Sequence, residues 1–568
     1  MIRYVCKYTP IELFAGFGAD CMPRNAMPEN FDHADKIAHA NLCGFGRSVI
    51  EAVLRDEVDE LVLVNCCDTM RRTYDIIRST GKVSFLYLLD LPHEDEECEK
   101  INFAHNLARL RDAYAEYSGR TFSRDRFVRS FERREPAAED YIGLLGTRVS
   151  PELEEVIRKS MHLPVRNLTC LGSRDLVFSA KDLKQAPDER LMYIYAEAIL
   201  TQIPCARMNT GTRRNPLFLD PHLRGIVYHT IKFCDYYGFE YAELKSQIHV
   251  PLLKIETDYT LQSMGQLYTR IEAFAETIEG LNPEDSSTRE LTERQNKMLN
   301  QNQYYVAGID SGSTSTDVVI MNQDAEIVSS IIIPTGSGAA ISADKSMEQA
   351  LAKAGLRKEE ILRVITTGYG RAYIESGDQS ITEITCHAKG AHYLNPKVRT
   401  IIDIGGQDSK VIRIDENGAV QNFLMNDKCA AGTGRFLDMM SRTLGISLDN
   451  MSTMGLKWHE DITISSMCTV FAESEVVSLV AQNKELSDII HGLNKSVAVK
   501  VGALAARLGE KEDYMMTGGV ARNRGIVSAL EERIGKPIYV CDESQICGAI
   551  GAALFALDKI SEEKSTEN

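Results

Sequence analysis

Short apolar runs and longer helical stretches alternate along the first half of the chain. Residues 43–56 and 266–280 read as helices, and residues 95–200 read as mostly helical. The apolar runs that predict buried strands are residues 60–65, 83–90, 225–233 and 250–258. Strands that alternate with helices predict parallel α/β units.

The second half contains one strand–turn–strand pattern twice. Residues 304–334 hold a strand, a turn of Gly, Ser and Thr, and a second strand. Residues 399–420 repeat this order around the turn "GGQDSK". Two such units separated by helices predict an internally duplicated α/β domain.

A polar stretch, residues 279–303, separates the two halves and lacks aromatic and β-branched apolar residues. Such a composition is typical of a linker. We therefore predict an N-terminal α/β part at residues 1–280, a linker at 281–303 and a second α/β domain at 304–560.

Composition narrows the classes of function. The 568 residues carry a net charge of −17, which disfavours nonspecific binding to nucleic acid or to an anionic membrane. The chain has no run of about 18 apolar residues and no signal-peptide layout at its start, so we expect a cytoplasmic protein. In that compartment the 14 cysteines are not expected to form disulfides, which raises the prospect of metal or redox use.

Three turns of small residues follow predicted strands in the second half: "GIDSGSTSTDVV" at 308–319, "DIGGQDSK" at 403–410 and "MMTGGVARNRG" at 515–525. Small residues let backbone N–H groups converge on phosphate oxygens. Asp310 and Asp403 stand at strand ends, where a carboxylate can hold Mg²⁺. One such turn could be a plain hairpin, but three in this order predict a nucleotide site.

This order of turns resembles the ATPase superfamily of actin, sugar kinases and heat-shock chaperones. The resemblance implies a duplicated, ribonuclease H-like fold of two lobes that close on ATP. By it, Asp310 and Asp403 are catalytic and organise Mg²⁺ and the attacking water, with Asp408 a weaker candidate. The residues expected to contact the nucleotide are Gly312, Ser313, Thr314, Ser315, Gly405, Gly406, Gln407, Gly518 and Gly519.

Two thiols of the second half stand beside predicted helix starts. Cys429 heads "CAAGTGRF", and Cys468 precedes "TVFAESEV". The positive end of a helix dipole favours a thiolate or an anionic cluster there. A [4Fe–4S] cluster normally takes four thiolates, which a two-fold homodimer would supply from two per chain. The alternative is a pair of buried structural cysteines.

Together with "GYGR" (368–371) and "EITCHAKGA" (383–391), these motifs resemble the activator component of 2-hydroxyacyl-CoA dehydratases. That family includes the ATPase subunits of benzoyl-CoA reductase. The resemblance spans residues 304–558. It implies a homodimer with one bridging [4Fe–4S] cluster, which couples ATP hydrolysis to low-potential electron transfer; we expect a ferredoxin or flavodoxin to supply the electrons. We interpret Cys386 as structural.

Several cysteines of the first half lie at the ends of predicted strands or at the start of a predicted helix. Cys66 and Cys67 follow one predicted strand, Cys234 follows another, and Cys43 precedes a predicted helix. Ligands of open α/β sheets gather at the carboxyl ends of strands, so these thiols are placed to converge on one cluster. They could instead be buried core residues.

Segments such as "NLCGFGRSV", "LVNCCDTMRRTYD" and "IKFCDYYGFEY" resemble the cluster-bearing component of the same dehydratases, and more closely its double-cubane branch. The dehydratases imply three cysteine ligands, matched by Cys43, Cys66 and Cys234, with Cys67 an alternate for Cys66. The double-cubane branch implies a larger cluster with more thiolates. Its further candidate ligands are Cys6, Cys67, Cys98, Cys170 and Cys205.

Charged residues beside these thiols, Arg71, Arg72, Arg207 and Glu256, are candidates either for substrate contact or for structural salt bridges. The first half is short for a full acyl-CoA pocket, and the usual second homologous subunit is absent from the chain. Both departures put dehydration of an acyl-CoA in doubt.

The favoured hypothesis is an ATP-driven electron donor fused to its own iron–sulfur acceptor. It would reduce a small molecule or reductively activate a dehydratase-type reaction on an acyl-CoA. One alternative is a metal-free small-molecule kinase of the same superfamily. Another is an ATP-dependent assembly factor that binds iron transiently, if at all.

Overall fold

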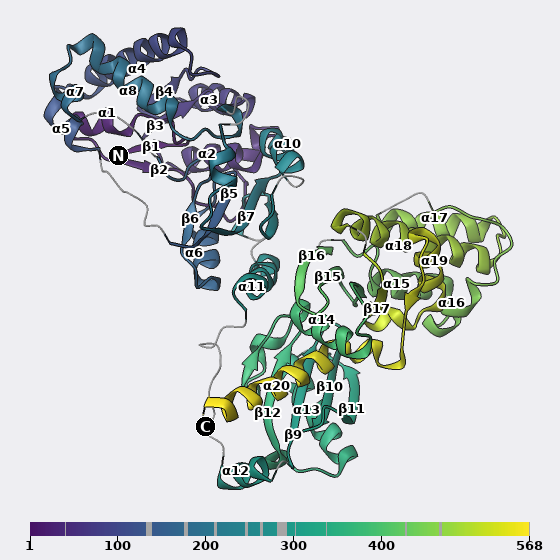
Figure 1. The fold of residues 1–568 in the computed structure, drawn as a ribbon. Helices are drawn as coiled ribbons and strands as arrows, with labels where there is room; N and C mark the ends of the chain where they lie inside the picture. The colour runs from purple at the N-terminus through teal and green to yellow at the C-terminus, as the bar shows by residue number, and fades with distance from the viewer. Residues whose placement is uncertain are drawn as a thin grey trace. The chain divides into compact units, whose positions relative to one another are not determined.

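The computed structural model divides the chain into two compact units, residues 1–271 and 272–568 (Figure 1). It describes residues 1–39, 41–131, 139–174, 176, 180–208, 213–244, 248–261, 265–280, 292–301, 303–336, 338–426, 429–464, 468–509 and 511–566. Half of the predicted linker, residues 281–291 and 302, lies outside these ranges. None of the helices in the described ranges combines the length and apolarity needed to span a bilayer.

The first unit contains a four-stranded parallel sheet in the order β2-β1-β3-β4. Its strands are β1 (Ile2–Tyr4), β2 (Cys21–Pro23), β3 (Glu60–Val64) and β4 (Phe85–Leu89). Parallel strands need crossover connections, which helices supply here. The helices of this part are α1 (Ile11–Gly16), α2 (Gly44–Leu54), α3 (Asp68–Thr80) and α4 (Glu97–Ser118).

A second parallel sheet of the first unit has the order β6-β5-β7-β8. Its strands are β5 (Tyr141–Gly146), β6 (Val165–Asn167), β7 (Leu223–Ile231) and β8 (Leu252–Thr257). The accompanying helices are α5 (Arg124–Arg129), α6 (Pro151–Ser160), α7 (Ala180–Gln185), α8 (Asp188–Thr201), α9 (Asn215–Phe218), α10 (Asp235–Leu244) and α11 (Gly265–Glu279). The four predicted strands are present. The prediction for residues 95–200 missed β5 and β6.

The second unit confirms the predicted duplication. Its two five-stranded sheets have equivalent orders, β11-β10-β9-β12-β13 and β16-β15-β14-β17-β18. The first comprises β9 (Tyr305–Ser311), β10 (Ser315–Asn322), β11 (Ile327–Pro334), β12 (Ile361–Thr367) and β13 (Gln379–Ser380). The second comprises β14 (Thr400–Ile404), β15 (Ser409–Ile414), β16 (Val420–Asn426), β17 (Tyr514–Thr517) and β18 (Ile538–Tyr539). We call these sheets, with their helices, the first and second lobes.

The strand register shows which residues of the two sheets are equivalent. In the first lobe Asp310 pairs with Thr367 across β9 and β12, and in the second Asp403 pairs with Thr517 across β14 and β17. The helices of this unit are α12 (Glu293–Asn300), α13 (Ala339–Ala354), α14 (Glu383–Leu394), α15 (Gly434–Leu444), α16 (Leu448–Met454), α17 (Thr469–Ala481), α18 (Leu486–Leu508), α19 (Arg524–Ile534) and α20 (Cys547–Thr566).

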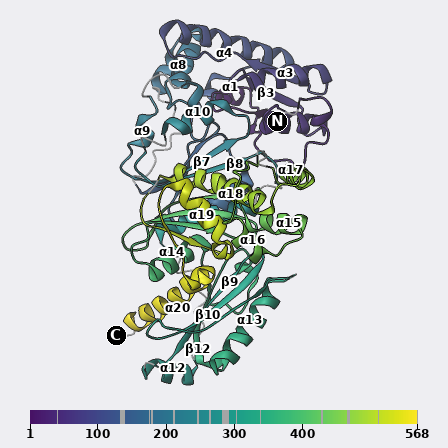
Figure 2. The same cartoon turned by 90° about the vertical axis from the view of Figure 1, so that its right-hand side faces the viewer.

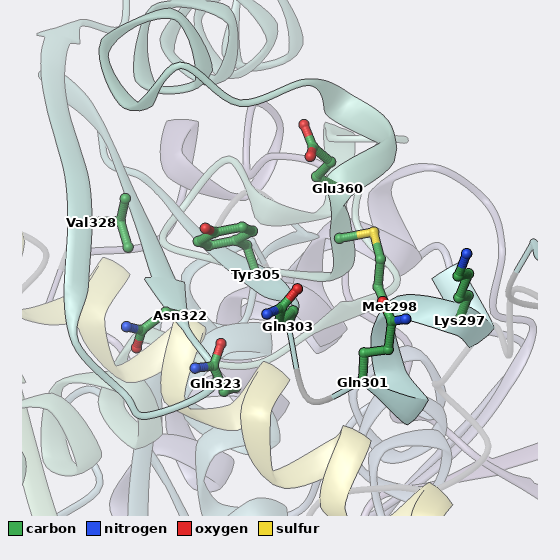
Figure 3. A pocket seen from close by; sticks show the side chains of 9 residues that line it. All are labelled: Lys297, Met298, Gln301, Gln303, Tyr305, Asn322, Gln323, Val328 and Glu360. Atoms are coloured by element: carbon green, nitrogen blue, oxygen red, sulfur yellow. The ribbon is translucent and has the colours of Figure 1, made fainter. Parts of the chain in front are cut away.

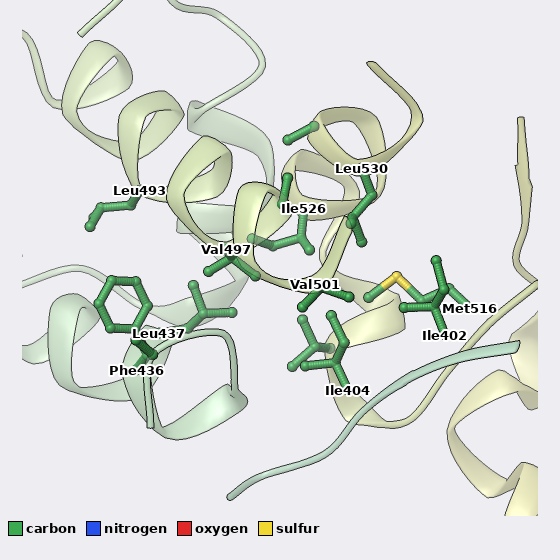
Figure 4. Close-up of a cluster of buried hydrophobic side chains, with 14 of the residues drawn as sticks. Ile402, Ile404, Phe436, Leu437, Leu493, Val497, Val501, Met516, Ile526 and Leu530 are labelled. Atoms are coloured by element: carbon green, nitrogen blue, oxygen red, sulfur yellow. The ribbon is translucent and has the colours of Figure 1, made fainter. Parts of the chain in front are cut away.

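An apolar core fixes the second lobe. Figure 4 shows side chains of α15, α18 and α19 meeting those of β14 and β17. Val497 and Val501 on α18 and Ile526 on α19 are among its fully buried members. Burying side chains of this size stabilises the fold by about 1.5–3 kcal/mol each.

Helix α20, the last of the chain, lies against the sheet of the first lobe (Figures 1 and 2). It crosses α14 at glycines, because a Cβ on Gly551 would overlap the carbonyl of Cys386 and one on Gly390 would overlap the carbonyl of Cys547. Gly308 of β9 likewise faces the backbone of α20. Only glycine permits backbones to approach this closely.

We predict that Gly551→Ala destabilises the second unit by about 1–3 kcal/mol, because the added methyl group overpacks a backbone contact. The matched substitution Gly238→Ala, in α10, meets no atom within 4 Å. It should stabilise its helix by about 0.5–1 kcal/mol. Chemical denaturation of both variants measures the sign of the change in the free energy of unfolding. Equal changes in the two variants would contradict the close crossing of α14 and α20.

Candidate functional site

The predicted phosphate turns share one geometry. The Gly312 N–H donates to the Ser315 carbonyl (2.9 Å), and the Gly405 N–H donates to the Asp408 carbonyl (3.0 Å). The two turns lie against each other, since a Cβ on Gly406 would overlap the Thr314 hydroxyl. The structure thus brings together predicted residues from both lobes.

The carboxylates of Asp310 and Asp403 face one imidazole. His387 of α14 has Nε2 3.8 Å from Asp310 Oδ2 and Nδ1 3.6 Å from Asp403 Oδ1. The Thr517 hydroxyl donates to Asp403 Oδ1 (2.9 Å). His387 is not among the site residues predicted from the sequence, although it lies within the "EITCHAKGA" motif.

Asp403 is held ionised by a buried cation. Lys410 Nζ lies 3.1 Å from Asp403, 2.8 Å from Asp408 and 3.2 Å from Glu383. Burial raises the pKa of Asp403, but His387, Lys410 and the Thr517 hydrogen bond outweigh it and lower the pKa to about 2. Lys410 thus forms ion pairs with both Asp403 and the weaker magnesium candidate Asp408.

Asp310 has the opposite electrostatic setting. Burial raises the pKa of its carboxyl group to about 7, and the nearby Asp317 and Glu383 add to the rise. Asp317 pairs with it across β9 and β10, and burial also raises the Asp317 pKa to about 7. Oδ1 of Asp317 is buried with no hydrogen-bond partner among the described residues. A divalent cation would satisfy both carboxyl groups, so the residues present fit Mg²⁺.

The third glycine turn lies beside Asp403. Gly518 has φ +83°, and a Cβ there would lie 2.7 Å from Asp403 Oδ1. Gly368, with φ +84°, packs in the same way on Asp310. A Cβ on Gly519 would meet nothing within 4 Å. Gly519 therefore borders open space, as a residue that contacts a nucleoside must.

Of the two predicted cluster ligands in the second unit, Cys429 has a cationic partner. Lys500 Nζ donates to its sulfur (3.0 Å). Burial raises the pKa of Cys429, but the hydrogen bonds from Lys500 and from the Ala431 N–H outweigh it, and the pKa is lowered. Cys468 is exposed and caps the N-terminus of α17.

Helix α17 presents an apolar face next to Cys468. Val470 and Phe471 are about two-thirds exposed, at 66% and 67%, and Val477 and Val480 are also exposed. Exposed apolar faces of this kind on soluble proteins mark interaction sites.

In the first unit, cysteines converge at the carboxyl ends of the strands of both sheets. Cys6 follows β1, Cys66 and Cys67 follow β3, Cys170 follows β6 and Cys234 follows β7. Cys43 caps α2, and Cys205 lies within electrostatic reach of Cys6 and Cys170. Cys170, Cys43 and Cys67 lie within electrostatic reach of Cys234.

Three of these thiols form a hydrogen-bonded chain. Cys66 bonds to both Cys6 and Cys67, and this lowers the pKa of Cys6 to about 6 and that of Cys67 to about 7. The same bonds raise the pKa of Cys66 well above its usual value. Two low-pKa thiols suit metal ligation, because the thiolate is the ligand.

A buried arginine that the sequence analysis missed stands among these thiols. The Arg148 backbone N–H donates to Cys170 Sγ (3.2 Å), and its guanidinium lies 3.6 Å from the centre of the Phe45 ring. Its charge also acts on Cys6 and Cys66. Arg148 follows β5, a strand that the apolar pattern did not reveal.

Other candidates lie elsewhere. Cys98 is an exposed residue of α4. Cys21 begins β2, and burial together with Glu12 raises its pKa to about 12. Arg207 donates to the carbonyls of Leu91 and Pro92, which is a structural contact.

Two further charged candidates form ion pairs at long distance. Arg72 pairs with Asp68 at 3.7 Å, and Glu256 lies 3.9 Å from Lys254. Within the described ranges, no three His, Cys, Asp or Glu side chains are arranged to hold a single metal ion. The gathered thiols, with the buried cations Arg148 and Lys7 beside them, instead fit the charge of an iron–sulfur cluster.

A separate polar hollow lies at the other end of β9. Figure 3 shows Tyr305, at the start of that strand, lining it with side chains such as Lys297 and Glu360. Asp310 stands near the opposite end of β9, so the hollow is not part of the nucleotide site.

Comparison with known families divides the chain as the two resemblances do. Residues 307–556 match the model of the BadF/BadG/BcrA/BcrD ATPase family. Residues 6–141 and 140–278 match the model of the 2-hydroxyglutaryl-CoA dehydratase D-component. The chain therefore joins two segments of different families.

Several relatives resemble the second segment. The 2-hydroxyisocaproyl-CoA dehydratase activator of Clostridioides difficile is 44% identical over 46% of this chain and 99% of its own length. The (R)-2-hydroxyglutaryl-CoA dehydratase activating ATPase of Acidaminococcus fermentans is 46% identical over 45% of this chain and 98% of its own. One of the benzoyl-CoA reductase subunits of Thauera aromatica is 33% identical over 38% of this chain and 77% of its own.

We predict that Asp310→Asn lowers ATP hydrolysis on the order of 10²-fold or more, because it removes a metal-holding carboxylate. The Mg²⁺ concentration that gives half-maximal hydrolysis by the wild type should also rise as the pH drops through about 7, because metal-free Asp310 takes up a proton there and the proton competes with Mg²⁺. Phosphate-release assays across pH and Mg²⁺ concentration check both. Asp324→Asn, in the exposed turn after β10, is the control. Equal rates in the two variants would rule out the role of Asp310.

Proposed function

The chain belongs to the BadF/BadG/BcrA/BcrD ATPase family through its second half, and on that premise we propose that it hydrolyses ATP to drive low-potential electrons into its own first half. The observation that carries the proposal is the pair of carboxylates, Asp310 and Asp403, one from each lobe, around His387. A nucleotide bound between the lobes would contact both. Closure and opening would then change the relative position of the lobes.

The electron-donating site is proposed at Cys429 and Cys468. The hydrogen bond from Lys500 and the lowered pKa of Cys429 support ligation by this thiol. Two chains related by a two-fold axis would supply four thiolates to one bridging [4Fe–4S] cluster. The exposed apolar face of α17 supports such a homodimer, because association would cover it. A ferredoxin or flavodoxin is the proposed external donor.

The accepting site is proposed at the thiols around Arg148. Cys43, Cys66 and Cys234 remain the proposed ligands of one cluster. Cys6, Cys67, Cys170 and Cys205 supply the larger ligand set of a double-cubane cluster. When bound, such a cluster stores and passes on low-potential electrons. Arg148 would offset its negative charge, and its N–H bond to Cys170 would favour the reduced form.

The match of the first half to a dehydratase component supports a small molecule or an acyl-CoA as the final acceptor. The relatives named as activators act on separate dehydratases. In this chain the corresponding partner segment is covalently attached, which raises its effective concentration without any new contact.

We predict that Cys429→Ser removes the iron of the second half and the ATP-dependent reductase activity, while nucleotide binding survives because the phosphate turns are separate. Cys541→Ser is the matched control, since Cys541 lies in the same unit and its thiol is within hydrogen-bond distance of the Ser544 hydroxyl, away from Cys429 and Lys500. Anaerobic iron counting, EPR and ATP binding check the pair. Full iron content in the Cys429 variant would exclude the bridging site, and a chain without iron would favour a kinase.

We also predict that Cys234→Ala lowers both iron content and stability of the first unit, because metal binding couples to folding where thiolates converge. Cys21→Ala should lower neither, since Cys21 stands among acidic residues away from the other thiols. The iron content per chain of the two anaerobically purified variants tests the proposed acceptor site. The same iron in both would refute the proposed acceptor site.

A further inference from the structure

One helix belongs to both compact units. Helix α11 (Gly265–Glu279) runs without interruption through the division between residues 271 and 272. It ends the segment matched to the dehydratase component, and the match to the ATPase family begins only at residue 307. The contacts of its C-terminal half are nevertheless made with residues of the ATPase segment.

Glu276 of α11 holds the start of α14. Its Oε1 accepts from the Thr382 N–H (2.9 Å), and its Oε2 accepts from the hydroxyls of Thr382 and Thr385. Thr382 is the N-cap of α14, and its own side chain makes no capping bond. A carboxylate from another helix therefore anchors the N-terminus of α14, where the helix dipole favours negative charge.

Glu272, one turn earlier, holds a second motif. It forms an ion pair with Arg371, the last residue of "GYGR". Arg371 also donates to the Gly368 carbonyl (3.1 Å), and Gly368 packs on the Asp310 carboxylate. Residues four apart share one face of a helix, so one face of α11 makes both contacts.

Both contacts lead directly to the catalytic carboxylates. Helix α14 carries Glu383, which pairs with Lys410, and His387, which lies between Asp310 and Asp403. We propose that Glu272 and Glu276 are positioning residues of the nucleotide site. Through these contacts, binding of the nucleotide changes the position of the C-terminal half of α11, and the helix transmits this change along its length. This inference rests on the proposed ATPase function of the second half.

The coupling between the nucleotide site and α11 acts in both directions. If the nucleotide shifts α14, the anchored end of α11 shifts with it, and any restraint on α11 changes nucleotide turnover in return. The relay needs no bound cluster. It is therefore measurable in protein that contains no iron.

The test compares hydrogen exchange of the full chain with ADP and with a non-hydrolysable ATP analogue. Peptides covering 272–279 should exchange several-fold differently in the two states. Glu276→Ala should abolish this difference and lower kcat for ATP hydrolysis about tenfold more than it changes KM, because α14 is displaced. Glu276→Gln keeps the volume and part of the hydrogen bonding, and should restore part of both.

Thr277→Val is the matched control, because the Thr277 hydroxyl donates to the Ala273 carbonyl within α11 itself (2.7 Å). It should keep the nucleotide-dependent difference. A difference that persists in Glu276→Ala, or is absent from the wild type while peptides 305–315 and 400–410 respond, overturns the relay alone. If those phosphate-turn peptides also ignore nucleotide, the ATPase site and the relay both fall.

Discussion

The second unit is organised around the approach of two buried carboxylates, one from each copy of a duplicated sheet. Bringing Asp310 and Asp403 near one imidazole is electrostatically costly unless charge is compensated. The second lobe compensates with Lys410, which keeps Asp403 ionised. The first lobe has Asp317 at the position paired with Asp310, where the second has Lys410 paired with Asp403. The two lobes thus have the same backbone pairing at the site but opposite charges beside the central aspartate. Asp310 is therefore the aspartate that lacks a neighbouring lysine and needs a cation.

The same constraint applies to the first unit. Thiols that follow separate parallel strands meet because the carboxyl ends of the strands share an edge. Without a metal, the chain of Cys6, Cys66 and Cys67 shares protons instead of crowding three negative charges. Two buried cations, Arg148 and Lys7, act on these thiols. In both units buried cations limit the repulsion between neighbouring anionic groups: Lys410 in the second unit, and Arg148 with Lys7 in the first.

Local patterns predicted most of this fold. Alternating strands and helices, and glycine turns after Asp310 and Asp403, indicated the duplicated domain and its phosphate turns. In the first half four strands escaped: β1, β2 and β6 have only three residues each, and β5, "YIGLLG", has two glycines and no alternation. Losing β5 also hid Arg148. His387 escaped for another reason, since a single histidine in a helix carries no periodic signal and its role depends on packing between lobes.

The placement of α20 has a consequence for synthesis. The sheet of the first lobe begins at β9, yet its inner face is completed by the last helix of the chain, against which Gly308 packs. On the ribosome, domains generally fold as units from the N-terminus. The first unit has all its strands before residue 258 and can close its core early, whereas the first lobe must wait for residues 547–566 to emerge. The half that matches the dehydratase component is thus finished before the half that matches the ATPase family, and a nascent chain cannot complete its nucleotide site before the first unit has folded.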